Sequence, residues 1–221
     1  MRRSTRFAFR FVPILVGLGL TMGSGAKAQE WTRFRGPNGT GVSDAKSIPT
    51  TFSEADYNWR IELPGYGHSQ PVIWGQKIFV TSAPEDGSAR HVSCVSVENG
   101  KILWTKSFEA TSYHNHERSS YASSTPALDE SRVYVTFQTG NRAFLAALDH
   151  DGELVWTHDL GTYDSQHGYG ASPIVYKDLL VFPFEQIARE GKPSPSYVIA
   201  LDRATGDLVW KTMRRSRRAA Y

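Results

Sequence analysis

The stretch Asp151-Gly152-Glu153-Leu154-Val155-Trp156, near the middle of the 221-residue chain, combines a glycine turn, one charged residue, two aliphatic residues and a tryptophan. The same pattern occurs at residues 99–104 and 205–210. The tryptophans of the three copies therefore recur at a nearly constant interval along the chain. Self-similarity at a fixed period of this size predicts a repeat architecture, in which each repeat is one supersecondary unit that packs on its neighbours.

Two further anchors recur in the same order as the tryptophan. A tyrosine is followed closely by a serine and a proline, and an aspartate precedes the glycine turn in the second and third copies. Aspartates that lie in register across repeats are expected to cap turns rather than to form acid–base pairs. The structural repeat motif therefore comprises Trp104, Trp156, Trp210, Gly100, Gly152, Gly206, Asp149, Asp202, Pro71, Pro126 and Pro173.

Each unit is predicted to contain four short antiparallel strands. In the second unit we place them at about 124–129, 132–138, 142–149 and 153–160, because β-branched and aromatic runs alternate there with Gly, Asn and Asp turn signals. Units of this kind repeated at about 50 residues predict an all-β fold, a β-propeller of four-stranded antiparallel blades. A β-sandwich or barrel does not predict three anchors in a fixed order. We expect each tryptophan to form a wedge between blades, at the inner edge of its blade.

The pattern Ala-Leu-Asp-x-x-x-Gly-x-x-x-Trp at residues 200–210 resembles the repeat of pyrroloquinoline quinone (PQQ) enzymes and their PQQ-like β-propeller relatives. Residues 147–156 carry it one residue shorter, and residues 31–41 are similar to the start of bacterial secreted PQQ-like repeat proteins. The resemblance implies a quinoprotein alcohol dehydrogenase-like propeller, in which the blade tryptophans serve as docking wedges.

The resemblance does not extend to a catalytic centre. The quinoprotein alcohol dehydrogenases carry a vicinal cysteine pair over the quinone and a Glu/Asn/Asp set for calcium, whereas this chain has one cysteine, Cys94, and no residue that matches the calcium ligands. We therefore assign no catalytic, cofactor-binding or metal-binding residue, and PQQ and calcium are implied by the resemblance alone. Cys94 lies in an apolar run and is expected to be a buried structural thiol. The non-enzymatic branch includes the outer-membrane β-barrel assembly lipoprotein, whose lipid-anchor cysteine has no counterpart here.

The segment at residues 1–28 has the features of a Sec-type signal peptide. A basic start precedes an apolar run at residues 11–20 and an Ala-x-Ala cleavage site at residues 26–28. The chain is therefore expected to be exported to the periplasm or secreted, with no membrane span after cleavage. An uncleaved anchor, as in a membrane-anchored sensor ectodomain, is the alternative.

The rest of the chain divides into a turn-rich lead-in at residues 29–57 and PQQ-like repeats at residues 58–221. Residues 58–63 are predicted to form a lone outer strand. Tyr221 stands where the next tyrosine anchor is expected. Three whole blades and a partial one are fewer than a closed propeller needs, so we expect an incomplete array that is truncated at its C-terminus.

The net charge of +3 depends on the segment at residues 1–28, where five side chains are basic and none is acidic. Residues 29–221 then carry 20 basic and 22 acidic side chains. Such a balance offers no clustered charge for binding a phosphate backbone. The basic segment at residues 214–218 is interpreted as a solvated loop.

Several polar clusters are candidate sites. Tyr113-His114-Asn115-His116-Glu117 could hold a metal through two histidines, but loop polarity also explains it. His68 and His167 each lie near a repeated tyrosine, where they either line a channel mouth or are ordinary loop histidines. Residues 164–167 bring Ser, His and Asp together only in sequence, which carries no weight for a triad.

Two loops complete the candidates. Residues 192–196 suggest a binding insertion or nothing at all. The glycines at 36–41 fit a phosphate loop poorly, because no strand precedes them and no helix follows. The sequence favours a non-catalytic scaffold that binds a protein partner or a small ligand at the propeller face, with no role for nucleic acid. The alternative is a PQQ-dependent dehydrogenase-like oxidoreductase whose catalytic elements lie outside this chain.

Overall fold

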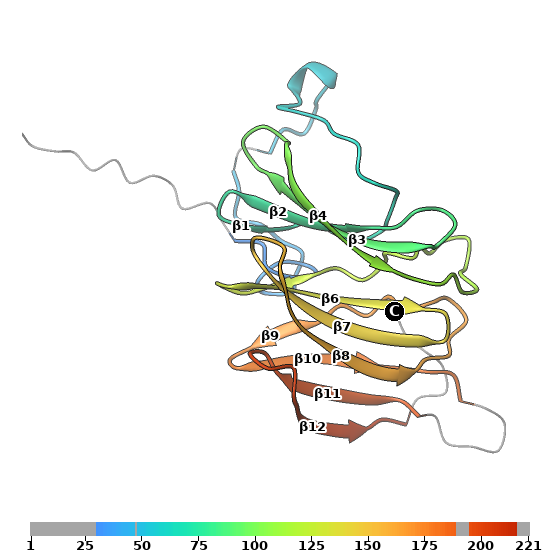
Figure 1. Cartoon of the computed structure of the whole chain (residues 1–221). Helices are drawn as coiled ribbons and strands as arrows, with labels where there is room; N and C mark the ends of the chain where they lie inside the picture. Colours follow the sequence, from blue (N-terminus) through green and yellow to red (C-terminus); the bar gives the residue numbers. More distant parts are fainter. Residues whose placement is uncertain (1–29, 47, 189–194, 216–221) are drawn as a thin grey trace, which may run out of the picture.

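The computed structural model describes residues 30–46, 48–188 and 195–215, which form an almost entirely β structure. The strands make three four-stranded antiparallel sheets, which stack face to face along the chain (Figure 1). Among the described residues, the one helical element is a 3-10 turn, η1 (Glu54–Asp56). The predicted β-propeller of four-stranded blades is confirmed. The predicted signal peptide lies outside the described residues.

The strands follow one another in chain order within each sheet. The first sheet contains β1 (Val72–Trp74), β2 (Lys77–Ser82), β3 (Ala89–Ser96) and β4 (Ile102–Glu109). The second contains β5 (Ala127–Leu128), β6 (Arg132–Thr139), β7 (Arg142–Asp149) and β8 (Leu154–Thr162). The third contains β9 (Ile174–Tyr176), β10 (Leu179–Phe184), β11 (Tyr197–Asp202) and β12 (Leu208–Met213).

The predicted strands of the second unit agree closely with the observed bounds of β6, β7 and β8. The first strand is shorter than predicted, and the residues just before it also contact the loop that precedes the third sheet. Ser124 Oγ donates to the carbonyl of Ala171 at 2.8 Å, and the Thr125 amide donates to Ser172 Oγ at 3.0 Å.

The first strands of the sheets lie next to one another, because β1 contacts β5 and β5 contacts β9. The fourth strands, β4, β8 and β12, therefore form the outer edge. The motif tryptophans lie on these fourth strands, so the expectation that they occupy the inner edge of a blade is wrong. Blades diverge outward from the axis, and a large indole fills the wider gap at the outer edge.

Each junction between blades places an indole ring on a buried glycine of the following sheet. Trp104 lies against Gly152, where an added Cβ would come within 2.8 Å of the ring, and Trp156 lies against Gly206, where the distance would be 2.6 Å. The indole N–H of Trp104 donates to the carbonyl of His150 at 3.1 Å, and that of Trp156 donates to the carbonyl of Arg203 at 3.3 Å. The glycines also adopt φ values of +91° and +79°, so both conformation and space exclude a side chain.

The segment before the first sheet makes the same junction without a strand. Trp59 covers Gly100 and donates to the carbonyl of Val97 at 2.9 Å. Residues 58–63 contain no strand, so the predicted lone outer strand is wrong. The tryptophan dock therefore does not need its own strand.

The outer face of the third sheet lacks such a partner among the described residues. Trp210 is 39% exposed, and every residue of β12 is exposed.

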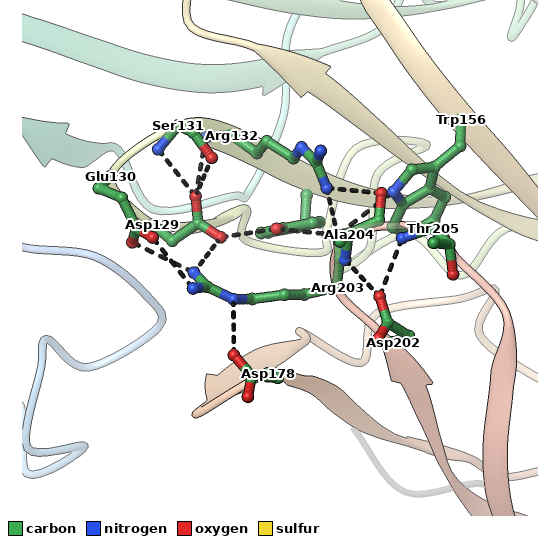
Figure 2. Close-up of polar contacts among 11 residues, drawn as sticks. Asp129, Glu130, Ser131, Arg132, Trp156, Asp178, Asp202, Arg203, Ala204 and Thr205 are labelled. Carbon is green, nitrogen blue, oxygen red and sulfur yellow. Dashed lines mark hydrogen bonds and ion pairs between the residues drawn. The ribbon is translucent and has the colours of Figure 1, made fainter.

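Polar side chains brace the junction between the second and third sheets (Figure 2). Arg203 contacts Asp129 at 2.7 Å and Glu130 at 3.0 Å, both from the turn between β5 and β6. Arg132 donates to the carbonyl of Arg203 at 2.7 Å, the same carbonyl that accepts the Trp156 indole N–H. At the first junction Lys77 Nζ donates to the carbonyl of His150 at 2.9 Å.

Two apolar clusters lie between the sheets, one at each junction. Cys94 belongs to the cluster between the first and second sheets and is fully buried. Burial raises the pKa of its thiol to about 11, so the thiol is neutral and unreactive at neutral pH. The interpretation of Cys94 as a buried structural thiol is confirmed.

We predict that Gly152→Ala destabilises the fold by about 3 kcal/mol, since left-handed backbone strain costs about 1 kcal/mol and displacement of the Trp104 ring adds about 2 kcal/mol. Gly161→Ala is the matched control, because Gly161 has a φ of +88° with nothing within 4 Å of an added Cβ. The expected cost of the control is about 1 kcal/mol. Urea unfolding of the two variants measures the difference, and equal costs would contradict the docking role of Trp104.

A second prediction concerns acid stability. Burial raises the pKa of Asp129, but hydrogen bonds from Tyr134, Ser131 and Arg203 outweigh it, so the pKa lies below its usual value. Its stabilising contribution is full above the unfolded pKa of about 3.9 and is lost as pH falls through the lower pKa of the folded state. We expect Asp129→Asn to cost about 2 kcal/mol at pH 7, the size of a hydrogen bond to a charged group, and to flatten the acid limb. Thermal melts between pH 2 and pH 7 test this, with the exposed Asp44→Asn as control; an unchanged acid limb in Asp129→Asn would contradict it.

Candidate functional site

The segments that precede the first strands lie side by side around the axis. The amides of His68 and Ser69 both donate to the carbonyl of Ala122, at 3.1 and 3.0 Å. The Gln70 amide donates to Thr125 Oγ1 at 3.0 Å, and the Thr125 amide donates in turn to Ser172 Oγ. Gln70, Thr125 and Ser172 each directly precede a repeat proline. The repeat therefore places equivalent positions in one hydrogen-bonded belt.

The lead-in closes over this belt. The Arg35 amide donates to Gln70 Oε1 at 3.1 Å, and the carbonyl of Arg35 accepts the Gly41 amide at 2.9 Å. These contacts hold Arg35 at a φ of +61°, in the left-handed region that non-glycine residues rarely adopt. Backbone conformations of this kind persist only where the surrounding structure fixes them, and they are common at functional sites.

A cavity of about 750 Å³ opens between the belt and the lead-in. Four segments contribute to it: the lead-in and the three loops that precede the first strands of the sheets. Ile174 of β9 and Pro183 of β10 complete the lining. Its lining consists of Arg33, Phe34, Arg35, Gly39, His68, Arg118, Ser119, Ser123, His167, Gly168, Gly170, Ala171, Ser172, Ile174 and Pro183. The volume lies in the range of small-molecule sites.

The charge of this lining is one-sided. It contains three arginines, Arg33, Arg35 and Arg118, and two histidines, while none of its described residues is an aspartate or a glutamate. The lining also contains serines and glycines. Guanidinium groups bind carboxylates and phosphates through paired, charge-assisted hydrogen bonds. The arrangement is therefore suited to binding an anion.

His68 and His167 both line this cavity, as the channel-mouth interpretation predicts. The ring of His116 packs edge-on against that of His167, with centroids 4.9 Å apart. His116 Nδ1 accepts a hydrogen bond from the Arg118 amide at 3.1 Å. The neutral ring then carries its proton on Nε2, which disfavours metal ligation through that nitrogen. The described residues contain no group of three or more His, Cys, Asp or Glu that could hold a metal.

The other candidate residues lie elsewhere. Asp149 Oδ1 accepts the amides of Asp151 and Glu153, and Asp202 Oδ1 accepts those of the two residues that follow Arg203. Ser165 Oγ donates to the carbonyl of Gly168 at 3.1 Å rather than engaging an imidazole. In the basic segment, Arg214 forms an ion pair with Glu185. Residues 192–194 and 216–218 lie outside the described residues.

The sequence reasoning missed the three arginines of the cavity. Arg33 and Arg35 belong to the glycine-rich lead-in, whose glycines were interpreted only against a phosphate loop. Arg118 directly follows the histidine cluster but belongs to no repeat. A signal did exist in the lead-in, since two arginines among turn-forming glycines suggest a positive loop.

The comparison with family models agrees with the repeat. The PQQ_2 family model, described as outer membrane protein assembly factor BamB, matches residues 51–220. Among solved structures, a europium-containing methanol dehydrogenase is similar at 18% identity and a TM-score of 0.47, covering 66% of this chain and 26% of that one. The chain thus spans about a quarter of the length of that structure. No curated protein matches.

The residues present do not fit the quinone–calcium centre that the resemblance implies. The sequence has one cysteine, and Cys94 is buried on β3 outside the cavity lining. The described residues that line the cavity also include no Asp or Glu, whose carboxylates are common calcium ligands. Finally, no helix among them has the length and hydropathy to cross a bilayer.

Proposed function

The chain belongs to the PQQ-repeat family described as outer membrane protein assembly factor BamB, and on this premise we propose that it is a non-catalytic binding scaffold whose binding site is the cationic cavity. The ligand is a small molecule that carries carboxylate or phosphate groups. In this proposal the signal peptide directs export. The lead-in closes the cavity, and the repeats build the blades.

One observation carries the proposal. Three arginines and two histidines converge on one cavity, and none of its described lining residues is acidic. A chain whose residues 29–221 have a slight excess of acidic side chains has no general attraction for anions, so the positive charge is local. That balance also argues against a nucleic-acid ligand.

The family description supports a place in the cell envelope. It names an outer membrane assembly factor. The signal peptide expected at residues 1–28 would direct export. A protein partner could use the same chemistry by placing an acidic side chain in the cavity. A small anion would then compete with that partner for binding.

We predict that citrate and inorganic phosphate bind to the purified chain and that Arg118→Gln weakens this binding at least tenfold, or about 1.4 kcal/mol. Isothermal titration calorimetry at low and high salt measures both the affinity and its screening. Arg60→Gln is the matched control, because Arg60 is an exposed arginine outside the cavity and the substitution removes the same charge.

Two results would contradict the scaffold. Absence of anion binding, or equal weakening by Arg60→Gln, would remove the cavity as the site. Dye-linked alcohol oxidation after addition of PQQ and calcium would instead support the dehydrogenase-like alternative. The expected result is anion binding without such oxidation.

A further inference from the structure

Arg90, on β3, is a cation in the core without an acidic partner. Its side chain is 1% exposed, and no carboxylate of the described residues pairs with it. Its guanidinium donates to the carbonyl of Gln138 through Nε and Nη2, at 3.1 and 2.9 Å, and to the carbonyls of Gly87 and Ala89. Burial of an arginine in this way is costly, so its surroundings must compensate for the lost hydration.

Two tyrosine rings supply part of that compensation. The guanidinium carbon lies 4.7 Å from the ring centroid of Tyr121 and 5.6 Å from that of Tyr113. The two rings meet edge to face with centroids 4.9 Å apart, and the Tyr121 hydroxyl donates to the carbonyl of Tyr113 at 3.2 Å. Cation–π contacts are strongest where water is excluded, as it is around Arg90.

These rings lie at the two ends of the loop that carries Arg118. Tyr113 packs on Gly168, where an added Cβ would lie 2.6 Å from the ring, and Gly168 lines the cavity. Between the two tyrosines, Ser120 Oγ accepts the His68 amide at 3.1 Å. The loop therefore meets the first sheet at Arg90 and the loop before the third sheet at Gly168, and Arg118 lies between its two tyrosines in the sequence.

The protonation states favour this arrangement. Burial lowers the pKa of Arg90, and the nearby tyrosines oppose that effect; an arginine remains charged even so. Burial raises the pKa of Tyr113 to about 12, so its ring is neutral at physiological pH. The Tyr113 hydroxyl has no hydrogen-bond partner within the described part of the chain, so ring packing is what holds this side chain.

We propose that Arg90 is the positioning residue of the anion site: it clamps residues 113–121 through two tyrosine rings and so holds Arg118 at the cavity. The inference rests on the proposed function of that cavity. Lysine cannot replace Arg90, because an ammonium lacks both the flat face for the rings and the fork of donors that reaches three carbonyls.

Arg90→Lys tests the clamp with the charge retained. We expect it to weaken citrate and phosphate binding about tenfold in the full chain and to cause no further loss in an Arg118→Gln background, because the two residues act through one contact. The matched control is Arg132→Lys, which alters another arginine that donates to backbone carbonyls, at the Arg203 brace rather than at the cavity; its affinity should be unchanged. Tyr121→Leu, which leaves the carbonyl contacts of Arg90 intact, should reproduce the loss and serves if Arg90→Lys does not fold.

Hydrogen exchange without ligand separates this inference from the proposed function. Faster exchange of residues 114–120 in Arg90→Lys, with wild-type exchange in Arg132→Lys, supports the clamp even if the wild-type chain binds no anion and the cavity fails as a site. Wild-type affinity and wild-type exchange in Arg90→Lys would overturn the inference. So would additive losses in the double variant, or an equal loss of affinity in Arg132→Lys.

Discussion

The packing of an indole ring on a buried glycine of the next sheet is the constraint on which the rest of this structure depends. A face-to-face stack of twisted sheets leaves a gap that widens toward the outer edge. The tryptophan fills this gap only because the facing residue has no side chain and adopts a left-handed φ. With the outer edges held apart in this way, the first strands are brought together at the axis, where the belt of Gln70, Thr125 and Ser172 forms.

The polar contacts of each junction gather on one backbone carbonyl. A carbonyl oxygen has two lone pairs, and at two junctions both are used. The carbonyl of His150 accepts Trp104 and Lys77, and the carbonyl of Arg203 accepts Trp156 and Arg132. Arg132 pairs with the repeat aspartate Asp149 across the second sheet. In the third sheet the residue that pairs with the equivalent Asp202 is Leu179, which is not basic. The basic residue is therefore a feature of the two internal junctions.

Most of the fold could be predicted from the sequence, because the junction repeats. The period, the glycine and the tryptophan predict four-stranded blades, and the hairpin signals place most strand ends. The edge on which the tryptophan lies could not be predicted, since strand order in a sequence does not say which strand faces the axis. The segment at residues 58–63 docks Trp59 without forming a strand, so the tryptophan keeps its contact where the sequence pattern predicts a strand that does not form.

The candidate site could be predicted only in part, for a reason that the repeat itself explains. His68 and His167 could be predicted from the sequence, because each lies near a repeated tyrosine. Arg33, Arg35 and Arg118 belong to none of the repeated anchors, and only the folded chain brings them to one cavity. The interval between the tyrosine anchors at positions 66 and 121 is longer than the interval between those at 121 and 169, and the longer one contains the loop of Arg118.

Repeated positions thus build the frame, and departures from the repeat supply its charge. A substitution at Gly152 or Trp104 disturbs a junction between two whole sheets, whereas one at Arg118 changes an exposed side chain above them. This separation lets the chemistry of the cavity vary while the contacts between blades are kept. Arg90 stands between the two roles, because it is buried in a blade yet contacts the loop that departs from the repeat.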